Sequence, residues 1–169
     1  MSKFEEMCTA FATGQKARDA YEERCVQNLA RLVQGFAAYC AFPDGMLKVV
    51  PLDKEIEHKM TYFLPSVANE SDDGFWNVGL WITLAEPRNA RQWAELLIAL
   101  SVAENDSGKT VVKIAERDTP RPIDPADPQQ LNEFCERLVG MIKKSVIGKP
   151  QSGQPSDDNA IGFKIGQTK

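Results

Sequence analysis

The chain has 169 residues, of which 43% are hydrophobic and 26% charged, so it has enough apolar material for one hydrophobic core. Its net charge of −4 and pI near 5.1 exclude a broad electrostatic attraction to nucleic acid, whose backbone is a polyanion. No apolar run approaches the roughly 18 residues of a membrane span, and the N-terminus carries acids where a signal peptide carries bases. We therefore expect a cytoplasmic protein without a nucleic-acid or membrane partner.

The first predicted element is a long amphipathic helix. Ser2 and Glu5 have the spacing of a capping box, so the helix can begin at once. Apolar residues then recur at three- and four-residue intervals: Phe4, Met7, Cys8, Phe11, Tyr21, Cys25, Leu29, Leu32, Phe36 and Tyr39. Unbroken, residues 2–40 would form a rod of roughly 55–60 Å, which is too long for a compact domain of this size. The helix therefore either breaks near Gly14 or projects residues 1–13 as an arm.

From residue 46 onward the apolar period changes to two, which predicts strands. The expected strands are Met46–Leu52, Met60–Val67, Trp76–Leu84, Leu96–Val102 and Thr110–Ala115, and the last two form a hairpin. Pro87–Trp93 is interpreted as a connection. A competing interpretation makes Ala90–Val102 a helix, because alanine, glutamate and leucine favour one. The strands predict an antiparallel sheet of four or five members.

The best-marked element is a second helix near the C-terminal end of the sequence. Asp127 is its N-cap, Pro128 occupies the first position and Gly148 closes it. Its apolar stripe consists of Leu131, Phe134, Cys135, Leu138, Val139, Ile142 and Val146. Residues 149–169 are rich in glycine, proline, serine and glutamine, and we expect them to be a flexible tail. The fold prediction is one α+β domain over residues 1–148, with the sheet between an N-terminal and a C-terminal helix.

The motifs for catalysis and metal binding are incomplete. Ser107-Gly108-Lys109-Thr110 ends like a phosphate-binding loop, but Ala103 stands where the first glycine belongs and strand-like residues follow, so we interpret it as a hairpin turn. His58 is the only histidine, which leaves one candidate base for any nucleophile. The four cysteines form no CxxC pair and are interpreted as reduced thiols. We expect no metal and no cofactor, and we lean against an enzyme.

One face of the sheet carries small residues beside a large indole. If the even-numbered residues of 76–84 and 96–102 form the main core, the opposite face holds Trp81, Asn77, Gly79 and Ser101. A floor of small residues admits something close to the backbone. A helix of the same chain, a groove for a partner peptide or apolar ligand, and a plain solvated face are the alternatives.

Two classes of function follow from these patterns. The first is a non-enzymatic protein-interaction module (an adaptor, chaperone or regulator). It is supported by the apolar residues Phe4, Met7 and Phe11. The sheet would struggle to cover these residues in addition to the apolar faces of both helices, so they predict a homodimer interface. The alternative is a small-molecule-binding or enzymatic domain that uses the sheet face around Trp81.

The element order depends on residues 87–93. If they formed a helix, the order over residues 20–146 would be α-β-β-β-α-β-β-α, which resembles that of class I type III secretion chaperones. The resemblance lies in element order alone and implies a small acidic dimer.

Overall fold

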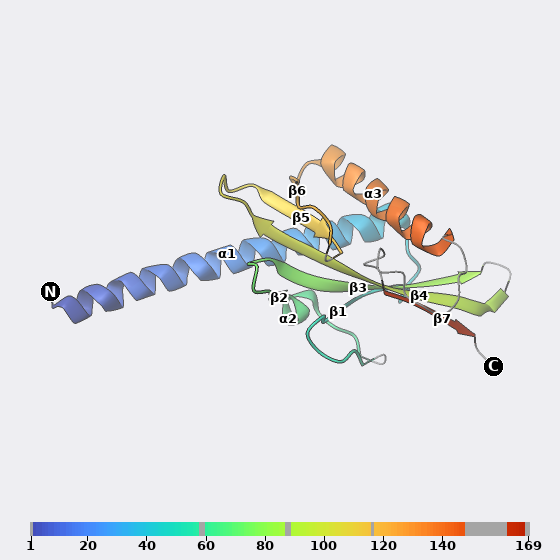
Figure 1. Cartoon of the computed structure of the whole chain (residues 1–169), viewed down its shortest axis with the longest axis horizontal. Helices are drawn as coiled ribbons and strands as arrows, with labels where there is room; N and C mark the ends of the chain where they lie inside the picture. The colour runs from blue at the N-terminus through green and yellow to red at the C-terminus, as the bar shows by residue number, and fades with distance from the viewer. Residues whose placement is uncertain (1, 58–59, 87–88, 116, 148–161, 168–169) are drawn as a thin grey trace.

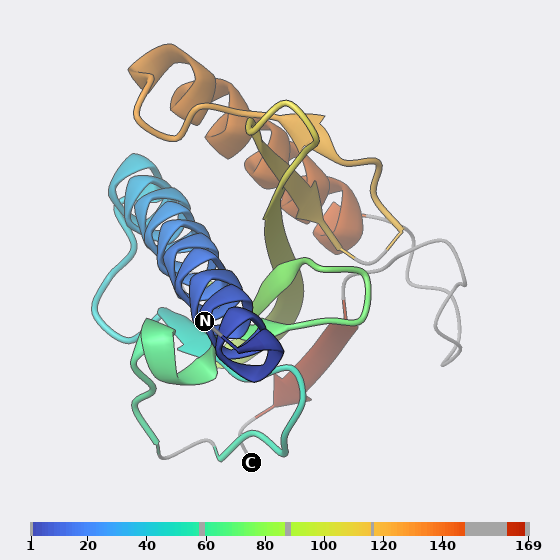
Figure 2. The ribbon, with the colours of Figure 1, turned by 90° about the vertical axis from the view of Figure 1, so that its left-hand side faces the viewer.

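The computed structural model describes residues 2–57, 60–86, 89–115, 117–147 and 162–167. Helix α1 (Lys3–Cys40) and helix α3 (Pro128–Ile147) pack on one face of an antiparallel sheet (Figures 1 and 2). This confirms the predicted α+β architecture with a helix before and a helix after the sheet. None of the helices in the described ranges is both long and apolar enough to cross a membrane.

The sheet follows the order β1-β3-β4-β5-β6, with β2 paired to β3 and β7 paired to β4. Its strands are β1 (Leu47–Val50), β2 (Asn69–Glu70), β3 (Trp76–Glu86), β4 (Asn89–Glu104), β5 (Thr110–Ile114), β6 (Arg121–Pro122) and β7 (Gly162–Gln167). The predicted strands at β1, β3, β4 and β5 are confirmed. The predicted hairpin of β4 and β5 is present as well. The turn 105–109 joins the two strands, and in it the Asn105 N–H donates to the carbonyl of Lys109 over 2.9 Å.

Strand β4 is longer than the sequence predicts. Its pairing with β3 runs from Trp76 opposite Val102 to Ala85 opposite Trp93, so Asn89–Trp93 belong to the strand. The predicted connection is therefore wrong for residues 89–93, and the alternative helix over 90–102 is wrong, whereas residues 87–88 lie outside the described residues. Strand pairing with β3 outweighs the intrinsic helix preference of these residues. The chaperone-like element order requires that helix and is absent.

The segment before β2 also differs from its prediction. The strand expected over 60–67 is wrong, because Leu64–Val67 forms the single helical turn α2. Pro65 stands in the first turn of this helix. A proline costs no backbone hydrogen bond at that position, whereas it removes a ladder donor from a strand.

Part of the expected flexible tail is a strand. Gly162–Gln167 forms β7, which pairs antiparallel with residues 92–97 of β4, so the prediction for 149–169 is wrong for these six residues. The pairing satisfies the backbone donors and acceptors along one edge of β4. These are main-chain groups, so the side-chain composition of the segment does not predict the pairing. The rest of the predicted tail lies outside the described residues.

The core lies between the sheet and the two long helices. From α1 it takes Cys25, Leu29, Leu32 and Phe36, from α3 Phe134, Cys135, Leu138 and Ile142, and from the sheet the even-numbered residues of 76–82 and 96–102 with Val112 and Ile114. The predicted division of the two sheet faces is therefore confirmed. Only the second half of α1 reaches this core.

Candidate functional sites

The first half of α1 is an arm that leaves the body of the protein (Figure 1). Residues 2–20 are all exposed, and α1 runs unbroken through Gly14. The Ser2–Glu5 capping box starts the helix as predicted. The arm meets the body at Arg18, which pairs with Glu70 over 3.1 Å. Of the two predicted alternatives, a break and a projecting arm, the structure has the arm.

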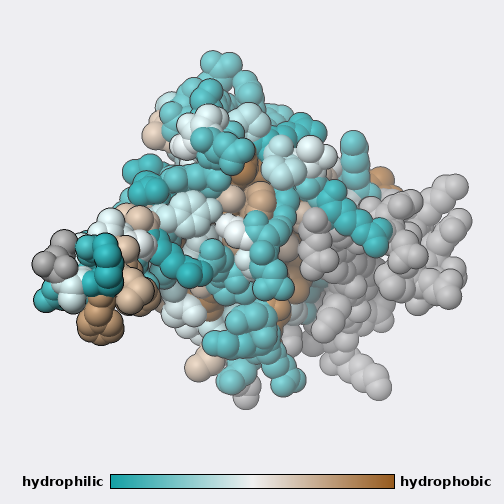
Figure 3. All heavy atoms as spheres, turned by 60° about the vertical axis from the view of Figure 1, so that its left-hand side comes forward, coloured by the Kyte–Doolittle hydropathy of each residue, from teal (hydrophilic) through white to brown (hydrophobic). Residues whose placement is uncertain are grey.

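Three large apolar side chains lie uncovered on this arm. Phe4 is 70% exposed, Met7 64% and Phe11 74%. Cys8 lies beside them and is exposed too. We call these four residues the arm stripe. Figure 3 shows apolar side chains gathered at the end of the arm among polar ones. The predicted interface residues are thus together on one surface, and nothing in the described part of the chain covers them.

The arm stripe continues the helix face that packs on the sheet. Phe4 lies three heptads before Cys25, and Phe11 lies three heptads before Leu32. Seven residues make almost two full turns, so positions three heptads apart differ by only about 60° around the helix. The stripe therefore points to the side of α1 on which the sheet lies, beyond the point where the sheet ends.

The predicted groove residues share the other face of the sheet. Trp81 is 8% exposed and Ser101 6%, and Asn77 is half-buried with its Nδ2 donating to the carbonyl of Phe75 over 3.3 Å. No described helix packs on this face, since the two long helices occupy the opposite one. The four residues are neighbours as predicted, but their side chains are largely withdrawn from solvent.

The space above Gly79 is taken by this chain's own side chains. A Cβ at Gly79 would come within 2.7 Å of Val50 Cγ2, 3.0 Å of Leu52 Cδ2 and 3.1 Å of Leu97 Cδ1. Val50 is the residue opposite Gly79 in the β1–β3 pair, so it leans over the glycine from the neighbouring strand. The small residue serves close packing of β1 and leaves no room for a ligand at that position.

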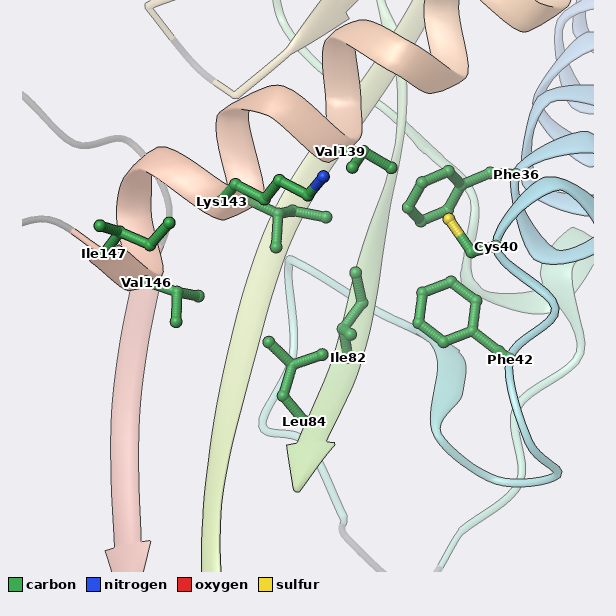
Figure 4. Close-up of a pocket in the computed structure, with 10 residues that line it drawn as sticks. Phe36, Cys40, Phe42, Ile82, Leu84, Val139, Lys143, Val146 and Ile147 are labelled. Atoms are coloured by element: carbon green, nitrogen blue, oxygen red, sulfur yellow. The ribbon is translucent and has the colours of Figure 1, made fainter. Parts of the chain in front are cut away.

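An apolar pocket of about 370 Å³, which no sequence pattern indicated, lies between the C-terminal ends of α1 and α3 (Figure 4). We call it the α1–α3 pocket. Its lining consists of Phe36, Cys40, Phe42, Ile82, Leu84, Val139, Ile142, Lys143, Val146 and Ile147. Phe36 and Phe42 meet edge to face, with ring centroids 5.4 Å apart, and close one wall. Its residues come from α1, α3, β3 and the segment after α1, so no local motif announces it.

Among the described residues that line the pocket, Lys143 is the only charged one. Its side chain is drawn from α3 toward Val139 and Phe36, across the pocket (Figure 4). Within the described residues it forms no ion pair. Burial raises the pKa of Cys40, which lies in the opposite wall, and this thiol therefore remains protonated at neutral pH.

The other residues considered for catalysis or metal binding are the four cysteines and His58. All four cysteines are free thiols, of which Cys25 and Cys135 are buried. Among the described residues no group of three or more His, Cys, Asp or Glu side chains is placed to hold a metal ion. His58 lies outside the described residues.

A scan against protein-family models, a search of curated proteins and a search of solved structures each gave no match for this chain.

Proposed function

We propose that this protein is a non-enzymatic, cytosolic interaction module that works as a homodimer, with the arm stripe as its interface. The observation that carries the proposal is the exposure of Phe4, Met7 and Phe11 on a helix that extends beyond its own sheet. Exposed apolar groups gathered on one surface mark interaction sites in soluble proteins. The free thiols of all four cysteines fit a reducing compartment.

A second copy of the arm is a suitable cover for the stripe. With Phe4 at heptad position a, Met7 falls at d and Phe11 at a, the spacing that lets two helices interlock. Among the flanking e and g positions of this stretch Lys3 is the one charged residue, and the others are Cys8, Ala10, Gln15 and Ala17. Glu6 points away from the stripe and pairs with Lys3 over 2.9 Å. Two arms can therefore approach closely.

The fold favours an antiparallel pair of arms. Because the stripe faces the side on which the sheet lies, a parallel partner helix would run into the sheet of the first copy. An antiparallel partner avoids this clash, since its body lies beyond the N-terminus of the first arm. The two-fold axis then passes near Met7 and Cys8, and Phe4 of one copy packs against Phe11 of the other.

The size of this contact predicts a weak dimer. Each copy contributes two phenylalanines and a methionine, and one buried aromatic side chain supplies about 150–250 Å². The total lies near or below about 1,200 Å², the lower end of specific interfaces. We therefore expect association that depends on concentration within the micromolar range.

Light scattering coupled to size-exclusion chromatography tests the proposal. The wild-type chain should approach twice its 18.8 kDa monomer mass at high micromolar concentration. The double variant Phe4→Ser, Phe11→Ser should be a monomer with an unchanged sheet signal in circular dichroism, because neither residue touches the core.

The matched control is Glu6→Ser with Thr13→Ser. These residues lie on the opposite side of the same helical arm, so the variant introduces two serines as the stripe variant does but keeps the stripe. It should remain dimeric. A wild-type chain that is monomeric at high micromolar concentration contradicts the proposal. So does a control variant that dissociates as fully as the stripe variant.

The alternative function, a ligand or catalytic site on the sheet face around Trp81, has less support. Val50, Leu52 and Leu97 fill the space above Gly79 on that face. We therefore do not place a substrate there.

A further inference from the structure

We propose that the α1–α3 pocket binds an unbranched alkyl chain that carries a single carboxylate, with the chain in the pocket and the carboxylate on Lys143. This inference is independent of the dimer proposal, because the pocket lies at the C-terminal end of α1 and the arm stripe at its N-terminal end.

The lining of the pocket selects the apolar part of the ligand. Of the ten described residues that line it, nine have aliphatic, aromatic or cysteine side chains, and none of these nine carries a charge. Its volume of about 370 Å³ is at the lower end of the roughly 300–1,000 Å³ common for ligand sites. A medium-length chain suits this volume better than a bulky cofactor. At the rim, Val146 is 41% exposed and Ile147 79%, so the pocket has an apolar entrance.

Lys143 selects the charge of the ligand. A lysine near the end of a helix often interacts with the helix dipole, but the basic residue of the last turn of α3 is Lys144. Lys143 instead points across the pocket (Figure 4) and is without an ion-pair partner among the described residues. An ammonium group beside an otherwise apolar surface is complementary to an anionic group at the end of an apolar chain.

Titration calorimetry with octanoate, nonanoate and decanoate, each below its micelle-forming concentration, tests the apolar part of the site. Each added methylene should tighten binding by about fourfold until the pocket is full. Absence of saturable binding, or an affinity that does not change with chain length, would overturn the proposal.

The role of Lys143 is tested by comparing acids with alcohols of equal length. Lys143→Gln should weaken decanoate binding by up to about fivefold, as expected for an exposed ion pair, and leave decanol binding unchanged. Lys144→Gln is the matched control and should bind decanoate like the wild type. Equal losses for acid and alcohol, or equal losses in both variants, would overturn the assignment of Lys143.

Thiol alkylation followed by mass spectrometry reports which molecule occupies the pocket. Cys40 lines the pocket, whereas Cys8 lies on the exposed arm and is the internal reference. Decanoate should slow the alkylation of Cys40 and not that of Cys8. The arm of a second copy is the other possible occupant. If Cys40 of the wild-type protein resists alkylation without any ligand and becomes reactive in the Phe4→Ser, Phe11→Ser variant, the arm of a second copy fills the pocket. The carboxylate proposal is then wrong.

Discussion

Lys113 is a strand residue that ties the β2–β3 turn to β5. Its Nζ lies 2.8 Å from Asp73 Oδ2 and 3.8 Å from the centre of the Phe75 ring. The side chain of Lys113 is only 14% exposed, and its carboxylate partner offsets the free-energy cost of burying the ammonium group. This contact and the Ser71 hydroxyl lower the pKa of Asp73 to about 2.

The lowered pKa of Asp73 predicts a pH-dependent contribution to stability. A carboxyl group whose folded-state pKa lies below its unfolded value of 3.8 stabilises the fold above that value and loses its contribution as pH falls toward 2. Because the Asp73 side chain is 51% exposed, solvent screening limits the effect to about 0.5–1 kcal/mol. Asp73→Asn should lower the free energy of unfolding by this amount at pH 7 and by nothing measurable near pH 2. Urea denaturation at both pH values measures it, and an equal loss at both would contradict the role of the charge.

Sequence reasoning worked best for residues whose structure is set by near neighbours. The capping box at Ser2 and the seam from Cys25 to Phe36 predicted α1 from contacts within a few turns of one helix. Gly79 was correctly placed on the second face of the sheet. Its role was not predictable, because Val50 reaches it from a strand almost thirty positions away.

At the scale of elements, β4 shows where local patterns fail. Its first residues, Asn89–Trp93, favour a helix by composition and become strand because β3 pairs with them. On its other edge β4 pairs with β5 near one end and with β7 near the other. The second of these partners comes from a segment whose composition is typical of disorder. The α1–α3 pocket escaped prediction for the same reason, since three stretches of chain far apart in the sequence (36–42, 82–84 and 139–147) converge to form it.

The pairing of β7 with β4 makes truncation a test of the fold. Deleting residues 149–169 should lower the melting temperature by several degrees, because six strand positions on β4 lose their partners. Deleting residues 168–169 alone keeps β7 and is the control. Differential scanning calorimetry measures both, and a melting temperature unchanged by the longer deletion would show that β7 contributes little to stability.

At the scale of the whole molecule, α1 is both a core helix and an extension. Its 38 residues give a length of about 57 Å, of which the sheet covers only the second half. The proposed dimer would place the two sheets at opposite ends of a shared pair of arms, far from one another. The α1–α3 pockets would lie at the outer ends of such a dimer and stay open to ligands.

The antiparallel arrangement predicts a specific cross-link. Cys8 of one copy lies next to the two-fold axis and so next to Cys8 of the other, at the 8–10 Å spacing typical of packed helices. A short bismaleimide should therefore yield a covalent dimer on a denaturing gel, and Cys8→Ser should abolish it. Phe4→Ser with Phe11→Ser should abolish it as well, although Cys8 is retained. A dimer by light scattering that resists this cross-linker would favour a different pairing of the arms.

The divided edge of β4 has a consequence for the order in which the chain folds. Strand β5 follows β4 after the short turn 105–109, whereas β7 lies 65–75 positions further along the chain than the residues of β4 with which it pairs. Closing the longer loop costs about 2 kcal/mol more chain entropy, so β3, β4 and β5 should assemble first and β7 should add late. Until then residues 92–97 present an open strand edge, which is a template for pairing with other chains. The hazard of aggregation is therefore concentrated in the interval between the first collapse and the arrival of the last strand.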